Sequence, residues 1–254
     1  MENKNNKIKA IDIINTIEEF APKELAIERD NIGLQVGNDI NKEVKKIGIA
    51  LDPSLSVVKK AEKEDIDFLF THHPILKDPI RTITGVIYEK LKILSKNDII
   101  LYSAHTNLDI CKNGLNDALV DLYNLKDVNN LYDNGLGRVG LFDGSFPELL
   151  DITKNNICKN PVVVGAPNLT KDKNLTVAVL SGYGLSQSSI NFVSNKNIDV
   201  YISGDLTHHS KIIAEENNLC IIDGGHYGTE VYGLKFIKKY LENRLNIPIV
   251  SLDF

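Results

Sequence analysis

Short apolar segments alternate with amphipathic segments along this chain of 254 residues, and this order limits its fold more than any other feature. Apolar runs such as 46–51 and 67–71 have the length and composition of buried strands. The segment 54–64 between them carries apolar residues at helical spacing. Strands that alternate with helices in this way form βαβ units, so the sequence predicts an α/β fold with largely parallel sheets.

The same order of elements occurs twice. In the first half, helices are expected at residues 8–20, 54–64, 86–96 and 113–123, and strands at 46–51, 67–71 and 99–102. In the second half, strands are expected at 175–180, 200–202 and 219–222, and helices at 186–194, 208–216 and 229–245. Both halves end on a strand, a short loop, a histidine and a carboxylate four residues later. This shared ending favours duplication over the general similarity of any two α/β stretches.

Two segments lack a clear period. Residues 31–38 contain two glycines and are expected to form a loop or an edge strand. Residues 125–173 are rich in Asn, Gly and Pro, and we expect a crossover between the halves with a short αβ piece.

Composition narrows the class of protein. With 29 Lys and Arg against 34 Asp and Glu, the formal charge of −5 argues against nucleic-acid binding. The three cysteines show no CxxC spacing, which indicates a reducing compartment and argues against a disulfide framework or a zinc ribbon. The first residues are polar, and no apolar run approaches the length of a membrane span. We therefore expect a soluble cytoplasmic protein without a membrane partner.

The six histidines are concentrated after predicted buried strands or at the start of the next helix. Ligands bind at the carboxyl ends of parallel strands, where loops and helix N-termini converge. Residues 71–74 read Thr-His-His-Pro, and His72 and His73 can straddle metal ions where proline bends the strand end. The alternative is a helix-capping threonine with surface histidines.

Two further segments pair a histidine with a carboxylate four residues later. His105 is followed by Asp109, which is either a metal ligand or the N-cap of the next helix. His226 and Glu230 have the i, i+4 spacing that places two ligands on one helix face. In the second half, Asp205 and His209 follow the strand equivalent to that of the first two histidines, and they are expected behind the ligands or against substrate.

Three imidazoles and two carboxylates make a suitable ligand set for two Zn²⁺, Mn²⁺ or Fe²⁺ ions. The set comprises His72, His73, Asp109, His226 and Glu230. No sulfur ligand is included, which argues against a structural zinc site.

The chain resembles the Nif-three-like family, whose members are often labelled GTP cyclohydrolase 1 type 2 homologs. The resemblance rests on an ordered set of segments: 30–37 (DNIGLQVG), 50–52 (ALD), 71–74 (THHP), 104–109 (AHTNLD), 137–140 (GRVG), 203–205 (SGD), and 225–226 (GH) with 229–230 (TE). It implies two intertwined, duplicated α/β repeats with mixed, largely parallel sheets covered by helices, in the short form without an inserted domain. We place the first repeat at residues 1–125, completed by 227–254, and the second at 126–226.

The resemblance also implies a toroidal homohexamer and a dinuclear site with the same five ligands and His105 beside them. We expect a metal-dependent hydrolase of a nucleotide-like or other small molecule, with His105 or His209 as proton-transferring catalytic residues. The alternative is a non-enzymatic oligomeric scaffold that binds metal or recruits a partner protein. The segment 181–184 (SGYG) contains only a GxG and gives little support for a nucleotide phosphate site.

Overall fold

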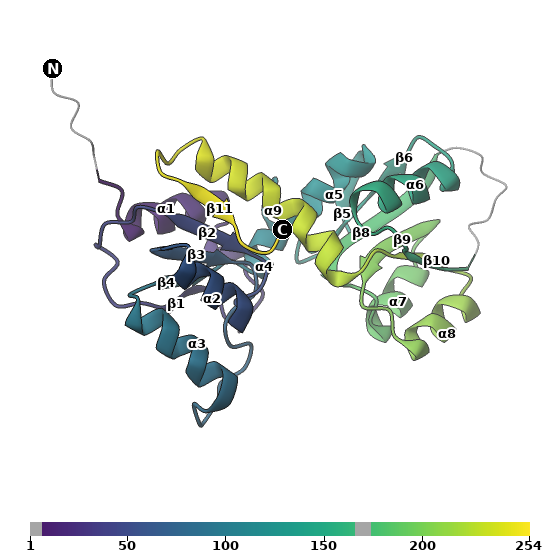
Figure 1. The fold of residues 1–254 in the computed structure, drawn as a ribbon. Helices are drawn as coiled ribbons and strands as arrows, with labels where there is room; N and C mark the ends of the chain where they lie inside the picture. The colour runs from purple at the N-terminus through teal and green to yellow at the C-terminus, as the bar shows by residue number, and fades with distance from the viewer. Residues whose placement is uncertain (1–6, 166–173) are drawn as a thin grey trace, which may run out of the picture. The chain divides into compact units, whose positions relative to one another are not determined.

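The computed structural model describes residues 7–165 and 174–254. These residues form two compact α/β units (Figure 1). The first unit comprises residues 1–111 and 234–254, and the second comprises residues 112–233. The second border falls inside a helix, α9 (His226–Glu242).

The first unit is built on a five-stranded sheet of order β1-β4-β3-β2-β11. All neighbouring strands are parallel except β1, which pairs antiparallel with β4. The strands are β1 (Gly33–Val36), β2 (Ile47–Ala50), β3 (Phe68–Thr71), β4 (Ile100–Ser103) and β11 (Ile249–Ser251). The helices are α1 (Ala10–Phe20), α2 (Leu55–Lys63), α3 (Gly85–Lys96) and α4 (Thr106–Ile110), with a 3₁₀ turn η1 (Lys23–Leu25).

Successive residues of the central strands face opposite sides of this sheet, because side chains alternate along a strand. Leu69 and Leu101 pack into a buried cluster with residues of α2 and α3, including Ala61 and Leu94. On the other face, Tyr102 is buried and its hydroxyl donates to a carboxylate oxygen of Glu18 in α1, at 2.7 Å. Helices therefore cover both faces of the sheet and leave its strand ends for polar residues.

The second unit is built on a six-stranded sheet of order β5-β6-β8-β9-β10-β7, in which only β8, β9 and β10 are mutually parallel. The strands are β5 (Lys126–Asn130), β6 (Arg138–Phe142), β7 (Val162–Val164), β8 (Leu175–Tyr183), β9 (Val200–Gly204) and β10 (Cys220–Asp223). The helices are α5 (Leu115–Tyr123), α6 (Phe146–Asn156), α7 (Gln187–Ser194) and α8 (His208–Glu216), with the start of α9.

The strand β8 shows how the second unit fills its core. Val177 and Val179 face a cluster that includes Leu119 of α5 and Leu149 of α6. Ala178 and Leu180 face the opposite cluster, which includes Ile190 and Val193 of α7 and Ala214 of α8. Because both faces are covered by helices, residues 177–180 of the strand are all apolar instead of alternating with polar residues.

The expected α/β fold with two mixed, helix-covered sheets is confirmed. Residues 31–38 contain an edge strand, β1. Four elements lie in the segment 125–165, namely β5, β6, α6 and β7, whereas we expected a crossover and a short αβ piece there. The remainder of that expectation, at 166–173, lies outside the described residues.

The borders of the units lie at 111/112 and 233/234, whereas the sequence places those of the repeats at 125/126 and 226/227. The helix α5 accounts for the first difference, because it packs on β8 of the second unit. Its residue Asn116 is fully buried and accepts a hydrogen bond from the backbone N–H of Ser181 at 2.9 Å.

Among the described residues, no helix is long and apolar enough to cross a membrane.

Candidate metal centre

Histidines follow the carboxyl ends of three parallel strands. His72 and His73 come directly after β3, His105 comes two residues after β4, and His226 comes three residues after β10. The first three belong to the first unit and His226 belongs to the second. Each unit therefore carries its own set of candidate metal ligands.

The set of the first unit is a compact group of three imidazoles. One ring nitrogen from each of His72, His73 and His105 lies within 4.8 Å of the others. His72 is fully buried, and the other two are partly exposed. An oxygen of Asp109, which is also buried, lies 3.9 Å from Nε2 of His72. Both the expected ligand Asp109 and the expected proton-transfer residue His105 are thus placed beside the two adjacent histidines.

Hydroxyl groups hold the backbone at the bend after β3. The Thr71 and Ser103 hydroxyls both donate to the carbonyl oxygen of His73, at 2.8 and 3.1 Å. Because Ser103 ends β4 and His73 directly follows β3, the second of these hydrogen bonds ties the end of β3 to the end of β4. This arrangement fixes the strand ends from which the three histidines project.

In the first unit, every histidine of the group has an oxygen acceptor at Nδ1. His72 donates to the carbonyl oxygen of Ala104 at 3.0 Å. His73 and His105 donate to the carboxylates of Asp52 and Asp30, each at 2.8 Å. A neutral imidazole with its proton on Nδ1 keeps the lone pair on Nε2, which is the atom then available to a metal ion.

Asp30 connects the group to the loop before β1. Its second oxygen accepts hydrogen bonds from the backbone N–H and the hydroxyl of Thr106, at 3.0 and 2.5 Å. Burial raises the pKa of Asp30, but the hydrogen bonds from His105 and Thr106 outweigh it and hold the pKa well below its ordinary value. Asp30 is therefore an anion that orients His105.

The second unit supplies a histidine and a carboxylate on one helix. Nδ1 of His226 lies 2.6 Å from an oxygen of Asp205, and Nε2 lies 3.0 Å from an oxygen of Glu230, one turn along α9. Glu230 is almost completely buried. Its hydrogen bond raises the pKa of His226 to about 9, with burial opposing this shift and Asp205 adding to it. In the absence of a metal ion, a proton bridges His226 and Glu230.

Glycines make room for this pair. A methyl group at Gly182, where φ is +70°, would overlap the carboxylate of Glu230. A methyl group at Gly204 would overlap the backbone nitrogen of His226. The Gly182 N–H donates to the hydroxyl of Thr229 at 2.9 Å, which fixes the start of α9 against the end of β8. Gly182, in the segment 181–184, thus packs directly against the His226–Glu230 pair.

The candidate ligands of both units are of the kinds that bind divalent metal ions. The donors are imidazole nitrogens and carboxylate oxygens, which suit Zn²⁺, Mn²⁺ or Fe²⁺. Asp30 and Asp52 were not expected as site residues, although both stand in segments that carry the family resemblance, 30–37 and 50–52. Asp205 was expected behind the ligands, and it contacts His226. His209 is exposed at the start of α8, with its ring centroid 5.4 Å from that of His208, and belongs to no group of potential ligands in the described part of the chain.

Fold and site together define an α/β protein of two mixed-sheet units with candidate metal-binding groups at its strand ends. The family model described as Duf34/NIF3 (NGG1p interacting factor 3) matches residues 8–254. The chain belongs to this family, as the sequence resemblance indicated.

The relatives include a Methanocaldococcus jannaschii protein named GTP cyclohydrolase 1 type 2 homolog. It is 68% identical over 97% of this chain and 100% of its own length. A Clostridium acetobutylicum protein of the same name is 34% identical over 96% of this chain and 95% of its own. A solved structure, reduced HcgD from Methanocaldococcus jannaschii, has a TM-score of 0.94 and 68% identity, and covers 98% of this chain and 99% of that one.

We predict that His226 of the metal-free protein titrates at about 9 instead of near 6.5. Because the pKa is raised on folding, the pair stabilises the fold fully below about pH 6.5 and loses this effect as pH rises through about 9. Glu230→Gln removes the acceptor charge and should lower the pKa. Histidine NMR titration of the chelator-treated protein measures both values, and an unchanged pKa in the variant would contradict this account.

Proposed function

We propose that the chain binds two divalent metal ions and acts as a metal-dependent hydrolase of a nucleotide-like or other small molecule. The proposed ligands are those of the sequence analysis: His72, His73, Asp109, His226 and Glu230. The observation that carries the proposal is the hydrogen bonding of the histidines. Each of the three ligand histidines has an oxygen acceptor at Nδ1, so the metal would bind at Nε2, and Nε2 of His226 lies 3.0 Å from the proposed ligand Glu230.

The proposal assigns different work to the remaining residues. Divalent ions in such a centre supply Lewis-acid chemistry, by polarising an electrophile and making water a better nucleophile near neutral pH. Asp52 and Asp205 orient His73 and His226. His105, held by Asp30, accepts or returns a proton at its Nε2. His209 is the second proposed proton carrier.

The name shared by the relatives makes hydrolytic opening of a heterocyclic ring the first reaction class to test. The alternative is a non-enzymatic scaffold. The experiments below distinguish it from the hydrolase, because a scaffold would bind metal but would show no turnover. The homohexamer and the cytoplasmic location stay predictions.

Metal content tests the centre itself. We expect about two transition-metal ions per chain in protein purified without a histidine tag, by elemental analysis. His72→Ala in the first unit and Glu230→Ala in the second should each reduce this content, because each removes a proposed ligand. His208→Ala removes an exposed histidine outside the centre and should retain the wild-type content. A folded wild-type chain that holds no metal after repletion would refute the proposal.

The orienting carboxylates provide a second test. Asp52→Asn and Asp205→Asn keep the size of the side chain but place an amide at Nδ1 of His73 or His226. Loss of such an orienting carboxylate costs about 10- to 100-fold in metal affinity. Competition titration with a chromogenic chelator measures the change. Asp39→Asn, at an acid outside the centre, is the control, and equal affinities in all variants would show that the carboxylates do not act on the ligands.

Turnover separates the hydrolase from the scaffold. Metal-loaded wild-type protein should hydrolyse at least one member of a panel of nucleotides and related heterocycles. Asp109→Asn and Glu230→Gln should reduce kcat/KM by about 100-fold or more, because removing a ligand removes charge stabilisation in the transition state. Chromatographic detection of the product measures this. Bound metal with no turnover on any substrate would favour the scaffold.

A further inference from the structure

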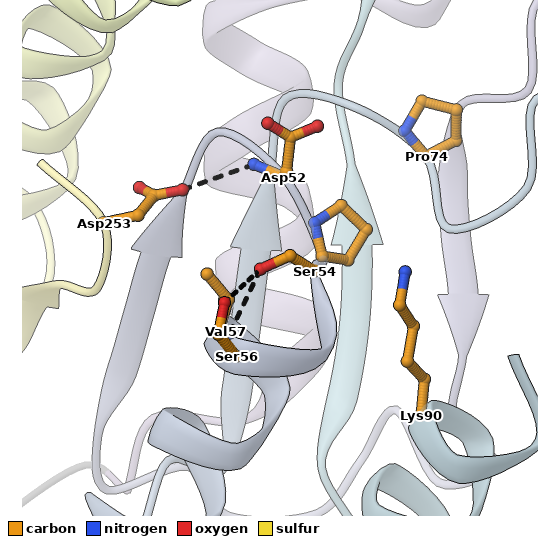
Figure 2. A pocket seen from close by; sticks show the side chains of 8 residues that line it. Asp52, Ser54, Ser56, Val57, Pro74, Lys90 and Asp253 are labelled. Atoms are coloured by element: carbon orange, nitrogen blue, oxygen red, sulfur yellow. Dashed lines mark hydrogen bonds between the residues drawn. The ribbon is translucent and has the colours of Figure 1, made fainter. Parts of the chain in front are cut away.

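A cavity of about 340 Å³ lies in the first unit at the carboxyl end of β2 (Figure 2). The start of α2, the helix α3 and the C-terminal segment supply its walls. Its lining residues are Asp52, Pro53, Ser54, Ser56, Val57, Pro74, Lys90 and Asp253. Its volume lies at the small end of the range for sites of organic ligands, about 300–1,000 Å³.

Among the residues that the structure describes, Lys90 is the only cationic side chain that lines this cavity. It extends from α3 toward Pro74, as Figure 2 shows. Its ammonium makes no hydrogen bond and no ion pair to the part of the chain that the structure describes. Burial lowers the pKa of Lys90, and Asp52 opposes this shift only partly. Partial desolvation destabilises this cation, and a bound anion would add to the partial compensation that Asp52 provides.

The start of α2 adds hydrogen-bond donors to the same cavity. The Ser54 hydroxyl caps the helix by accepting from the N–H of Val57 at 3.2 Å, and it lies 2.8 Å from the hydroxyl of Ser56. The N–H group of Ser56, which lines the cavity in the first turn, donates to no acceptor among the described residues. One of these hydroxyls donates to the other, so one hydroxyl proton, the Ser56 N–H and the positive end of the helix dipole add to the charge of Lys90.

The two acids of the lining already have partners. Asp52 accepts from Nδ1 of His73 at 2.8 Å. Asp253 accepts from the N–H groups of Leu51 and Asp52, at 3.0 and 3.5 Å for the nearer oxygens. Figure 2 shows Asp253 on the opposite side of Asp52 from Lys90. The acids therefore oppose a second anionic group and favour a ligand whose remaining part is neutral or donates hydrogen bonds.

We propose that this cavity binds the oxyanion group, a phosphate or a carboxylate, of a small organic molecule, with Lys90 as its counter-ion. The inference rests on the proposed function only for the claim that this molecule is the substrate. Asp52 supports that claim, because the same carboxylate lines the cavity and orients His73, a proposed metal ligand. The substrate class is then a small molecule with a single anionic group.

Binding of inorganic phosphate and of acetate to the full chain tests the proposal. Isothermal titration of wild type, Lys90→Gln and Lys92→Gln is carried out on chelator-treated and metal-loaded protein. Lys92 is exposed on the same helix and does not line the cavity, so it is a matched control. We expect saturable binding by wild type, at least about tenfold weaker binding by Lys90→Gln, and less than about twofold change in Lys92→Gln. Whichever of phosphate and acetate binds more tightly identifies the type of oxyanion that the cavity accepts.

Ser56→Ala is a second variant, at an exposed position, and we expect it to bind the anion several-fold more weakly than wild type. Circular dichroism and thermal unfolding show whether each variant is folded. Equal binding by Lys90→Gln and wild type, or no saturable binding of either anion by wild type, would overturn the proposal. Metal content distinguishes this failure from failure of the proposed function. If the chain holds no metal but binds phosphate through Lys90, the anion site is supported and the proposed hydrolase is refuted. If the chain holds metal but binds neither anion, only the metal centre is supported.

Discussion

The hydrogen bond at Nδ1 of each site histidine is the interaction on which the candidate centre depends. His72 uses a backbone carbonyl, and His73, His105 and His226 use the carboxylates of Asp52, Asp30 and Asp205. Each acceptor fixes the ring orientation and a proton on Nδ1, so that Nε2 faces the site, where Nε2 of His226 lies 3.0 Å from an oxygen of Glu230. A carboxylate acceptor also increases the electron density of the ring, which strengthens it as a metal ligand or proton carrier. The loops that bring these acceptors are therefore part of the site.

The parallel strands explain why these acceptors meet the histidines. Asp52 follows β2 and His73 follows its neighbour β3, while Asp205 follows β9 and His226 follows its neighbour β10. Adjacent parallel strands end at the same edge, so residues that are distant in sequence lie side by side there. The same pairing of neighbouring strand ends occurs in both units. The sheet thus places these residues side by side, and the residue type at each strand end determines whether it can orient a histidine or bind a metal ion.

Sequence patterns predicted the type of most elements because buried strands and amphipathic helices differ in period. They could not resolve β7, which has three residues, or α4, which has five, since such lengths show no period. Histidines could be predicted as site residues because they are rare and follow strands. Asp30 and Asp52 could not be separated from the many other acids, because their role depends on contacts across 75 and 21 residues of sequence. The role of Gly182 depends on the space needed by Glu230, which only the fold reveals.

The interrupted first unit has a consequence for how the chain folds during synthesis. Residues 112–233 are contiguous and contain all strands of their own sheet, so the second unit has every part it needs once that segment has been made. The first unit gains β11 only after the whole of the second unit has been synthesised, since β11 pairs with β2 and Asp253 accepts from Leu51. Its closing contacts therefore span about 200 residues of sequence, a separation that slows folding. During synthesis, the second unit can therefore fold before the first unit is complete. Until β11 has been made, the sheet of the first unit has an unpaired edge at β2.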